Sequence, residues 1–186
     1  MLLEDNAQII IGIVLKRKEA MYENEKTYKY KVFSIRSYEE DIEYDTFISK
    51  ENLDEFTANV GDIVFRLAYP TKVIVVNEET KGLLINNQYC IIRPYKYNSD
   101  LLGWFLKSKF ADNQFQKVLI GSTIKTVPVS GLRKINIPKL DVEEQNKISG
   151  LIKNVEKEKK LYKKMIKEKE KICNIIVSNK INGGNI

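Results

Sequence analysis

Short runs of β-branched and aromatic residues, separated by turn-forming residues, recur along the first half of the chain. Asn59-Val60-Gly61-Asp62 precedes one run, and Gly82 lies between two others. Apolar runs bounded by Gly, Pro, Asn and Asp are typical of strands joined by tight turns. The pattern therefore predicts a mostly antiparallel or mixed sheet with strands at Gln8–Leu15, Tyr28–Ser34, Ile63–Leu67, Val73–Asn77 and Tyr89–Pro94.

The period of the pattern changes after residue 98. Four apolar residues between Leu101 and Leu106 share one helical face, which predicts a helix over 99–108. A second helix is predicted over 110–118, before a Gly-Ser-Thr segment interrupts the helical spacing. Residues 129–137 are predicted to form a short turn and strand. These elements together predict an α+β domain.

A long helix is predicted to follow Pro138. Asp141 is a suitable N-cap, and Glu143 and Glu144 lie in the first turn, where the helix dipole favours acids. Apolar residues then recur at heptad spacing, although Glu158 and Lys169 interrupt the seam. The predicted seam consists of Ile148, Leu151, Ile152, Val155, Tyr162, Met165, Ile172 and Ile176.

A helix of about 38 residues, ending at Asn182-Gly183-Gly184, would be ~57 Å long at ~1.5 Å per residue. The small domain before it cannot cover a stripe of that length, so a partner helix is expected. The alternative is a helix that folds back on the domain or frays beyond Lys157. The expected organisation is a domain at 1–140, a coiled-coil-like helix at 141–181 and a flexible tail at 182–186.

Charge is distributed unevenly along the chain. The formal net charge is +6, yet Lys and Arg balance Asp and Glu over residues 1–152, and residues 153–171 alone carry a net charge of +5. The basicity therefore belongs to the predicted long helix. Residues 38–55 are strongly acidic, whereas residues 56–152 hold thirteen basic and eight acidic residues, which allows one basic face after folding.

Several kinds of chemistry are excluded or disfavoured. The sequence has no histidine, so serine–histidine and cysteine–histidine catalysis is excluded. Cys90 and Cys173 are far apart in apolar contexts, which disfavours a zinc cluster or a disulfide framework and favours buried thiols. No dinucleotide or Walker fingerprint is present. No catalytic residue, metal site or cofactor is expected. No apolar run approaches the length of a membrane span, and no secretory signal is recognisable, so the expected location is the cytoplasm.

The most informative polar segment is the loop that begins at Gly121. Small residues expose backbone N–H groups, two hydroxyls can donate to phosphate oxygens, and a lysine adds positive charge. Gly121, Ser122, Thr123 and Lys125 are therefore candidate contacts to a sugar-phosphate backbone. An ordinary polar loop between helices is the alternative.

Two further groups of residues are candidates for nucleic-acid contacts. Arg66, Tyr69, Thr71 and Lys72 crowd a strand–turn–strand junction, where Arg66 can read a guanine edge or pair with an acid such as Asp62. Lys16 and Arg17 follow the first predicted strand and are either contacts or a solvated charge run.

Taken in order, these segments resemble a known family. The resemblance is carried by Gly61-Asp62-Ile63-Val64-Phe65-Arg66, by Gly121-Ser122-Thr123-Ile124-Lys125, and by Leu132–Pro138 running into the acidic helix start at Leu140–Ile148. This arrangement is similar to the DNA specificity subunit of type I restriction-modification systems. The resemblance extends from about Gln8 to Lys180 and corresponds to one target-recognition domain followed by one spacer helix.

The resemblance implies a non-catalytic reader of double-stranded DNA that docks onto an adenine-N6 methyltransferase subunit, with a nuclease-translocase subunit joining for restriction. Complete family members carry two such units, each reading half of a split site. A chain with one unit is expected to restore two by forming a homodimer through its helix, which would give a palindromic split site. The acidic stretch 38–55 is then expected to face away from DNA.

The sequence departs from the family pattern at two places. The Trp-containing first strand with its Leu-Gly-Asp turn is missing, and the double proline before the acidic helix is reduced to Pro138. Two alternatives follow. One is an adaptor or decoy that engages the methyltransferase or a specificity subunit through its helix without reading DNA, and the other is a small metal-dependent enzyme that uses carboxylates.

Overall fold

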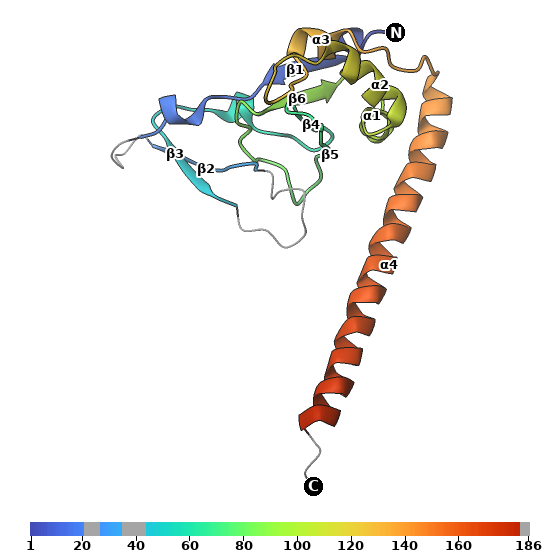
Figure 1. Ribbon diagram of the computed structural model, residues 1–186. Helices are drawn as coiled ribbons and strands as arrows, with labels where there is room; N and C mark the ends of the chain where they lie inside the picture. The colour runs from blue at the N-terminus through green and yellow to red at the C-terminus, as the bar shows by residue number, and fades with distance from the viewer. Residues whose placement is uncertain (21–26, 35–43, 183–186) are drawn as a thin grey trace.

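The computed structural model describes residues 1–20, 27–34 and 44–182. Its main sheet has four antiparallel strands in the order β1-β6-β4-β5 (Figure 1). The strands are β1 (Ala7–Ile11), β4 (Ile63–Arg66), β5 (Val73–Val75) and β6 (Tyr89–Pro94). The predicted α+β class and antiparallel sheet are confirmed, and the bounds of β6 match the prediction.

Both faces of the main sheet are buried, because successive side chains of a strand point to opposite sides. Ile63 and Phe65 of β4 belong to a core shared with the helices, whereas Val64 between them packs in a second core with Phe33 and Tyr89. Two edge-to-face ring pairs, Phe65 with Phe115 and Phe33 with Tyr89, connect the sheet to the segments that cover it. The central strands β4 and β6 are therefore nearly all apolar.

A second, two-stranded sheet lies at the end of the molecule away from the helices (Figure 1). It pairs β2 (Tyr28–Lys31) with β3 (Thr46–Ser49) in antiparallel register. Strand β3 was not predicted, because it lies within the acidic stretch 38–55. The predicted first strand was too long: after Gly12, which is packed against the backbone of Asn86, the chain forms a 3-10 turn at Leu15–Arg17.

Three short helices cover one face of the main sheet. They are α1 (Ser99–Leu106), α2 (Lys109–Val118) and α3 (Val129–Arg133). The side chains of Asn98 and Ser108 cap α1 and α2 by accepting hydrogen bonds from N–H groups of the first turn. The predicted turn and strand over 129–137 was wrong: Pro128 leads into α3, and only Asn136 forms an isolated bridge, with Leu2.

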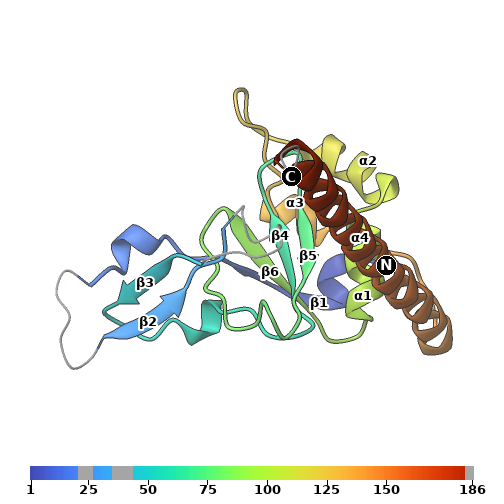
Figure 2. The ribbon, with the colours of Figure 1, turned by 90° about the horizontal axis from the view of Figure 1, so that it is seen from below.

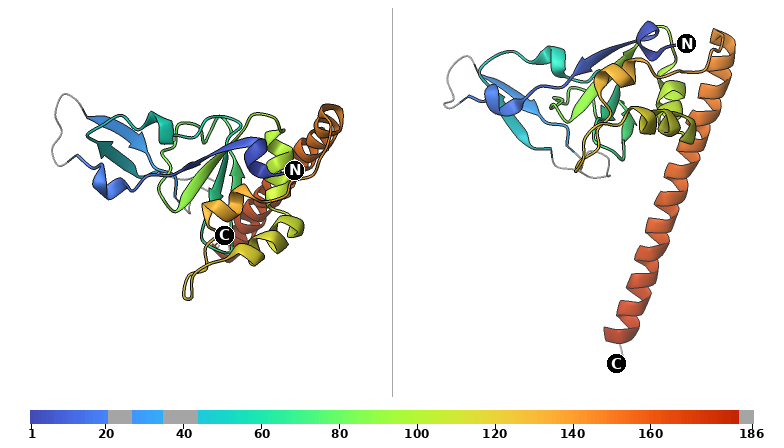
Figure 3. Two further views of the ribbon diagram at one scale, coloured as in Figure 1. Left: turned by 90° about the horizontal axis from the view of Figure 1, so that it is seen from above. Right: turned by 45° about the horizontal axis from the view of Figure 1, so that its top comes forward.

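Helix α4 (Val142–Asn182) is 41 residues long and leaves the domain as a single rod (Figures 1 and 3). Asp141 accepts a hydrogen bond from the backbone N–H of Glu144, whose carboxylate accepts one from the N–H of Asp141, so the predicted N-terminus is a capping box. The helix neither folds back on the domain nor frays beyond Lys157. Its predicted end at Gly183-Gly184 and the remainder of the predicted tail lie outside the described residues.

The two cysteines have different surroundings. Cys90 of β6 is buried, and burial raises the pKa of its thiol to about 12. Cys173 is exposed on α4, so the expectation that both thiols are buried was wrong for this residue. Within the described ranges, no helix combines the length and apolar character needed to cross a membrane.

Candidate nucleic-acid interface

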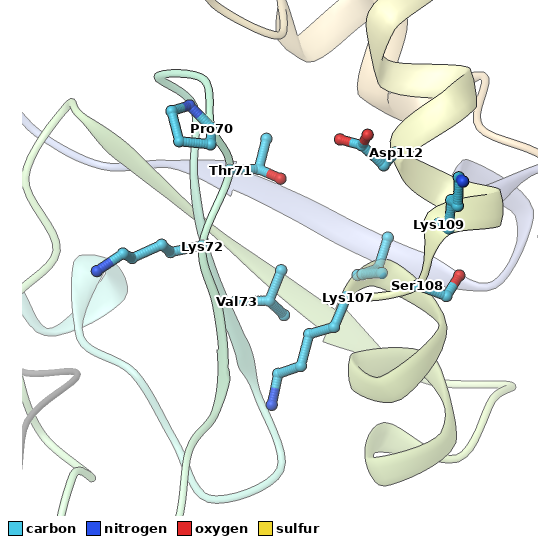
Figure 4. Close-up of a pocket in the computed structure, with 9 residues that line it drawn as sticks. Pro70, Thr71, Lys72, Val73, Lys107, Ser108, Lys109 and Asp112 are labelled. Carbon is cyan, nitrogen blue, oxygen red and sulfur yellow. The ribbon is translucent and has the colours of Figure 1, made fainter.

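A cleft of about 680 Å³ separates the turn after β4 from the junction between α1 and α2 (Figure 4). Thr71 and Asp112 point towards each other across it, and the ammonium end of Lys72 points away from the helices. The lining residues are Pro70, Thr71, Lys72, Val73, Leu106, Lys107, Ser108, Lys109 and Asp112.

The rim of the cleft is predominantly basic. Lys107 and Lys109, on either side of the α2 cap, are exposed and line the cleft across from Lys72, which precedes β5. The single acid of the lining, Asp112, accepts hydrogen bonds from Gln116 at 2.8 Å and from the Tyr69 hydroxyl at 3.4 Å. Ammonium and hydroxyl groups arranged in this way can bind phosphate oxygens.

A hairpin spanning residues 120–126 borders the same region. Ile120 and Thr126 exchange two backbone hydrogen bonds, with N···O distances of 3.0 and 2.8 Å. Gly121 has φ +100°, and a Cβ there would collide with the carbonyl oxygen of Ile124, so the turn requires glycine. The turn geometry thus explains the glycine that interrupts the helical pattern.

Backbone hydrogen bonds join this hairpin to the turn after β4. The N–H of Tyr69 donates to the carbonyl of Lys125 at 2.8 Å, and the N–H of Val127 donates to the carbonyl of Leu67 at 2.9 Å. The structure therefore brings together two of the predicted groups, which are separated by about fifty residues in the sequence. The two adjacent segments carry Arg66, Tyr69, Thr71, Lys72, Gly121, Ser122, Thr123 and Lys125.

The outer residues of the hairpin are available for contact. Residues 121–125 are all exposed, and the hairpin projects from the body of the domain in Figure 2. Within the described ranges, the hydroxyls of Ser122 and Thr123 have no hydrogen-bond partner.

Arg66 does not pair with Asp62. Asp62 is buried and accepts two hydrogen bonds from Arg93, at 2.9 and 2.7 Å, and this pairing raises the pKa of the Arg93 guanidinium. Arg66 lies opposite Tyr89 in the ladder, and in the part of the chain that the structure describes it forms no ion pair. Burial raises the pKa of the Tyr89 hydroxyl, and the charge of Arg66 acts in the opposite direction. The expected pairing of Arg66 with Asp62 is therefore replaced by the pair of Arg93 with Asp62.

Lys16 and Arg17 are not part of this surface. They lie in the 3-10 turn beside the second sheet, where the following residue, Lys18, pairs with Glu51 (Figure 1). The described part of the acidic stretch, residues 44–55, comprises β3 and the residues on either side of it, at the end of the molecule away from the 120–126 hairpin (Figure 2). Residues 38–43 lie outside the described part of the chain.

Sequence reasoning did not identify Lys107, Ser108 and Lys109 as site residues. Their only local signal is a polar interruption between two helical patterns, which is typical of any helix–helix turn. No group of three or more Cys, Asp or Glu residues that could hold a metal ion occurs among the residues described.

The predicted seam of α4 divides into two parts. Ile148 and Ile152 pack against the core of the domain, next to α1. The other six residues are 47–66% exposed. We call these six the apolar stripe of α4: Leu151, Val155, Tyr162, Met165, Ile172 and Ile176.

Solved structures of other proteins have a similar architecture. The S subunit of the type I restriction-modification system from M. genitalium superposes with a TM-score of 0.63 over 96% of this chain, at 14% identity. The chain has the fold of half an S subunit. The HsdS subunit from Thermoanaerobacter tengcongensis gives a TM-score of 0.62 over 96% of the chain, at 15% identity.

A third structure, which concerns complex assembly and conformational transition of the type I R-M system, gives a TM-score of 0.64 over 95% of this chain, at 16% identity. The chain spans 42–47% of the length of these three proteins. The likeness is one of fold, because the identities are low. No protein-family model matches the chain, and no curated protein matches it by sequence.

Proposed function

We propose that this chain is a non-catalytic DNA specificity subunit that directs an adenine-N6 methyltransferase to a split DNA site. The observation that carries the proposal is the S-subunit fold over 95–96% of the chain, with a domain and a long helix in the same arrangement. The chemistry of the surface described above adds independent support. Under this proposal the protein requires no cofactor and acts in the cytoplasm.

The DNA contact is assigned to the 120–126 hairpin and the turn after β4. Lys125, Ser122 and Thr123 supply charge and hydroxyls for phosphate oxygens, and Lys107 and Lys109 extend the basic surface along the cleft. Arg66 is the candidate for a base contact, since a guanidinium can donate two hydrogen bonds to a guanine edge. The second sheet, with the acidic residues that flank β3 and the nearby turn that holds Lys16 and Arg17, lies to one side of these segments.

The apolar stripe of α4 is assigned to a second copy of this chain. Six exposed apolar side chains on one long helix leave a large apolar surface in water, and pairing two helices covers it. Such a pair carries two recognition domains related by twofold symmetry, which matches a palindromic split site. The same helices would hold the methyltransferase subunit, and the nuclease-translocase subunit would join that assembly for restriction.

Light scattering tests this assembly. The full chain would be measured alone and mixed with the adenine-N6 methyltransferase subunit of a type I system from the same genome. A dimer that recruits the methyltransferase supports the proposal. A monomer that does not bind the methyltransferase contradicts it.

The exposed stripe also favours a second candidate, an adaptor or decoy that engages the methyltransferase or a full specificity subunit without reading DNA. Charge reversal at Lys125 and Arg66 separates the two candidates. A DNA reader loses affinity for DNA after this change, whereas an adaptor retains every interaction that it makes through α4.

A further inference from the structure

Ile124 occupies an unusual position for a large apolar residue. It lies in the turn of the 120–126 hairpin, and its side chain is 68% exposed. The hairpin projects away from the sheet and helices when the molecule is viewed from below or from above (Figures 2 and 3). Scattered exposed apolar residues are ordinary on protein surfaces. An exposed apolar residue in the turn of a projecting hairpin can insert into a ligand without any movement of the domain.

The base of the hairpin is fixed to the domain. Its two ends exchange a pair of backbone hydrogen bonds, and its second arm pairs with residues 67–69 through Tyr69 and Val127. The carbonyl oxygen of Ile124 would collide with a Cβ on Gly121, so the turn is tightly wound. Ile124 is therefore presented by a supported backbone, which reduces the entropy lost when it is buried.

The segment that carries Ile124 favours a polyanionic ligand. Residues 113–140 contain no Asp or Glu, and they contain five basic residues, among them Lys117 and Lys125. The two hydroxyls that precede Ile124 have no partner within the described ranges. An apolar tip that is followed by a lysine and preceded by two free hydroxyls differs from a protein-docking patch, whose central residues are mostly apolar.

We propose that Ile124 is an apolar wedge that inserts between two adjacent base pairs of the recognised DNA, a proposal that rests on the DNA-reading function above. Ser122, Thr123 and Lys125 would hold the flanking phosphates. The isoleucine side chain would move out of water and insert between the bases. Aliphatic side chains used in this way unstack a base step and kink the duplex. Because base steps differ in how easily they unstack, such a wedge adds sequence preference without a hydrogen bond to a base.

Fluorescence of base analogues in the bound duplex tests the wedge. The probe is the duplex that the full chain enriches from a random pool, made with 2-aminopurine at one adenine or pyrrolocytosine at one cytosine at a time. Both analogues brighten when unstacked. The wild-type chain is expected to brighten the analogues beside one base step in each half-site. Ile124→Ala and Ile124→Ser are expected to abolish this rise and to weaken binding roughly tenfold.

Ile120→Ala is the matched control. Ile120 is the same residue type in the same hairpin and is 55% exposed, but it lies at the base, where its backbone pairs with Thr126. This variant is expected to keep both the affinity and the fluorescence rise. Equal effects of Ile120→Ala and Ile124→Ala would assign the losses to the hairpin as a whole and overturn the wedge.

The remaining outcomes separate the wedge from the proposed function. If the wild-type chain binds its duplex but no analogue brightens, the wedge is wrong and DNA reading stands. The same holds if Ile124→Ala weakens only the binding of the methyltransferase, because Ile124 is then a protein contact. If the wild-type chain enriches no sequence and binds no duplex, both proposals fail.

Discussion

The side chain of Gln145, in the first turn of α4, accepts a hydrogen bond from the backbone N–H of Asn98, the cap of α1, at 2.9 Å. Its amide donates to the carbonyl of Leu140 at 3.1 Å, and the residue is only 6% exposed. One turn further along α4, Ser149 donates a hydrogen bond to Asp100 at 3.3 Å. These bonds fix the direction in which the long helix leaves the domain.

Replacing this glutamine tests the joint. Gln145→Leu removes the buried amide and leaves its two partners, the N–H of Asn98 and the carbonyl of Leu140, unpaired, so the free energy of unfolding is expected to fall by about 1–3 kcal/mol. Urea denaturation of the full chain measures the change. The control is Asn146→Leu at the next position, which is exposed and is expected to have little effect. Equal stability of both variants would mean that Gln145 does not hold the joint.

The apolar stripe of α4 is predicted to hold two copies of the chain together. Val155→Asp combined with Ile172→Asp places two charges in the stripe and is expected to convert a dimer to a monomer, because burying unpaired carboxylates is costly. Analytical sedimentation at tens of micromolar measures the oligomeric state. A dimer that persists at this concentration has an association free energy of roughly 6–7 kcal/mol or more.

Asn174→Asp adds a charge to the opposite side of the same helix and is expected to leave the dimer intact. A wild-type chain that is already monomeric at this concentration would contradict the assignment of the stripe. Ile148 is unsuitable for this test, because it packs against the domain and its replacement would also disturb the fold.

Lys125 is predicted to contact phosphate. Lys125→Glu is expected to weaken binding to every duplex and to reduce the slope of log affinity against log salt by about one. Lys81→Glu is the control, since Lys81 is exposed in the turn beyond the opposite end of β5 and pairs with Glu78. An unchanged slope in Lys125→Glu would remove this residue from the interface.

The two thiols are predicted to differ in reactivity. At pH 8, Ellman's reagent is expected to titrate one thiol per native chain, the exposed Cys173, and two in guanidinium. Two reactive thiols in the native chain would contradict the burial of Cys90.

The buried thiol also predicts a pH dependence of stability. The pKa of Cys90 is about 12 when folded, against an ordinary value of 9.0, so the unfolded chain loses this proton first. The contribution of Cys90 to the free energy of unfolding is therefore fully present below pH 9 and is lost as the pH rises towards 12.

Hydrophobic periodicity predicted most of the fold, because β4, β6 and the helices each bury a continuous apolar face. It missed β3, since Thr46–Ser49 is a short run inside an acidic stretch and owes its pairing to β2. It also misread Val129–Arg133, where valine and glycine disfavour a helix but burial of Leu132 and the preceding Pro128 support one.

The candidate site was predicted in pieces. The sequence indicated the turn after β4 and the Gly121 loop separately, and a long-range backbone pairing through Tyr69 and Lys125 joins them. Lys107 and Lys109 enter the site only because α1 and α2 pack over the sheet, which no local pattern encodes. Likewise, the heptad spacing of α4 does not indicate that Ile148 and Ile152 face their own domain.

Selection of bound duplexes from a random pool by the full chain, followed by sequencing, tests the central claim most directly. Two copies that each read half of a split site predict an enriched sequence of two inverted half-sites, separated by a gap of fixed length and free base composition. Enrichment of a single uninterrupted half-site, or of no sequence at all, would contradict the account.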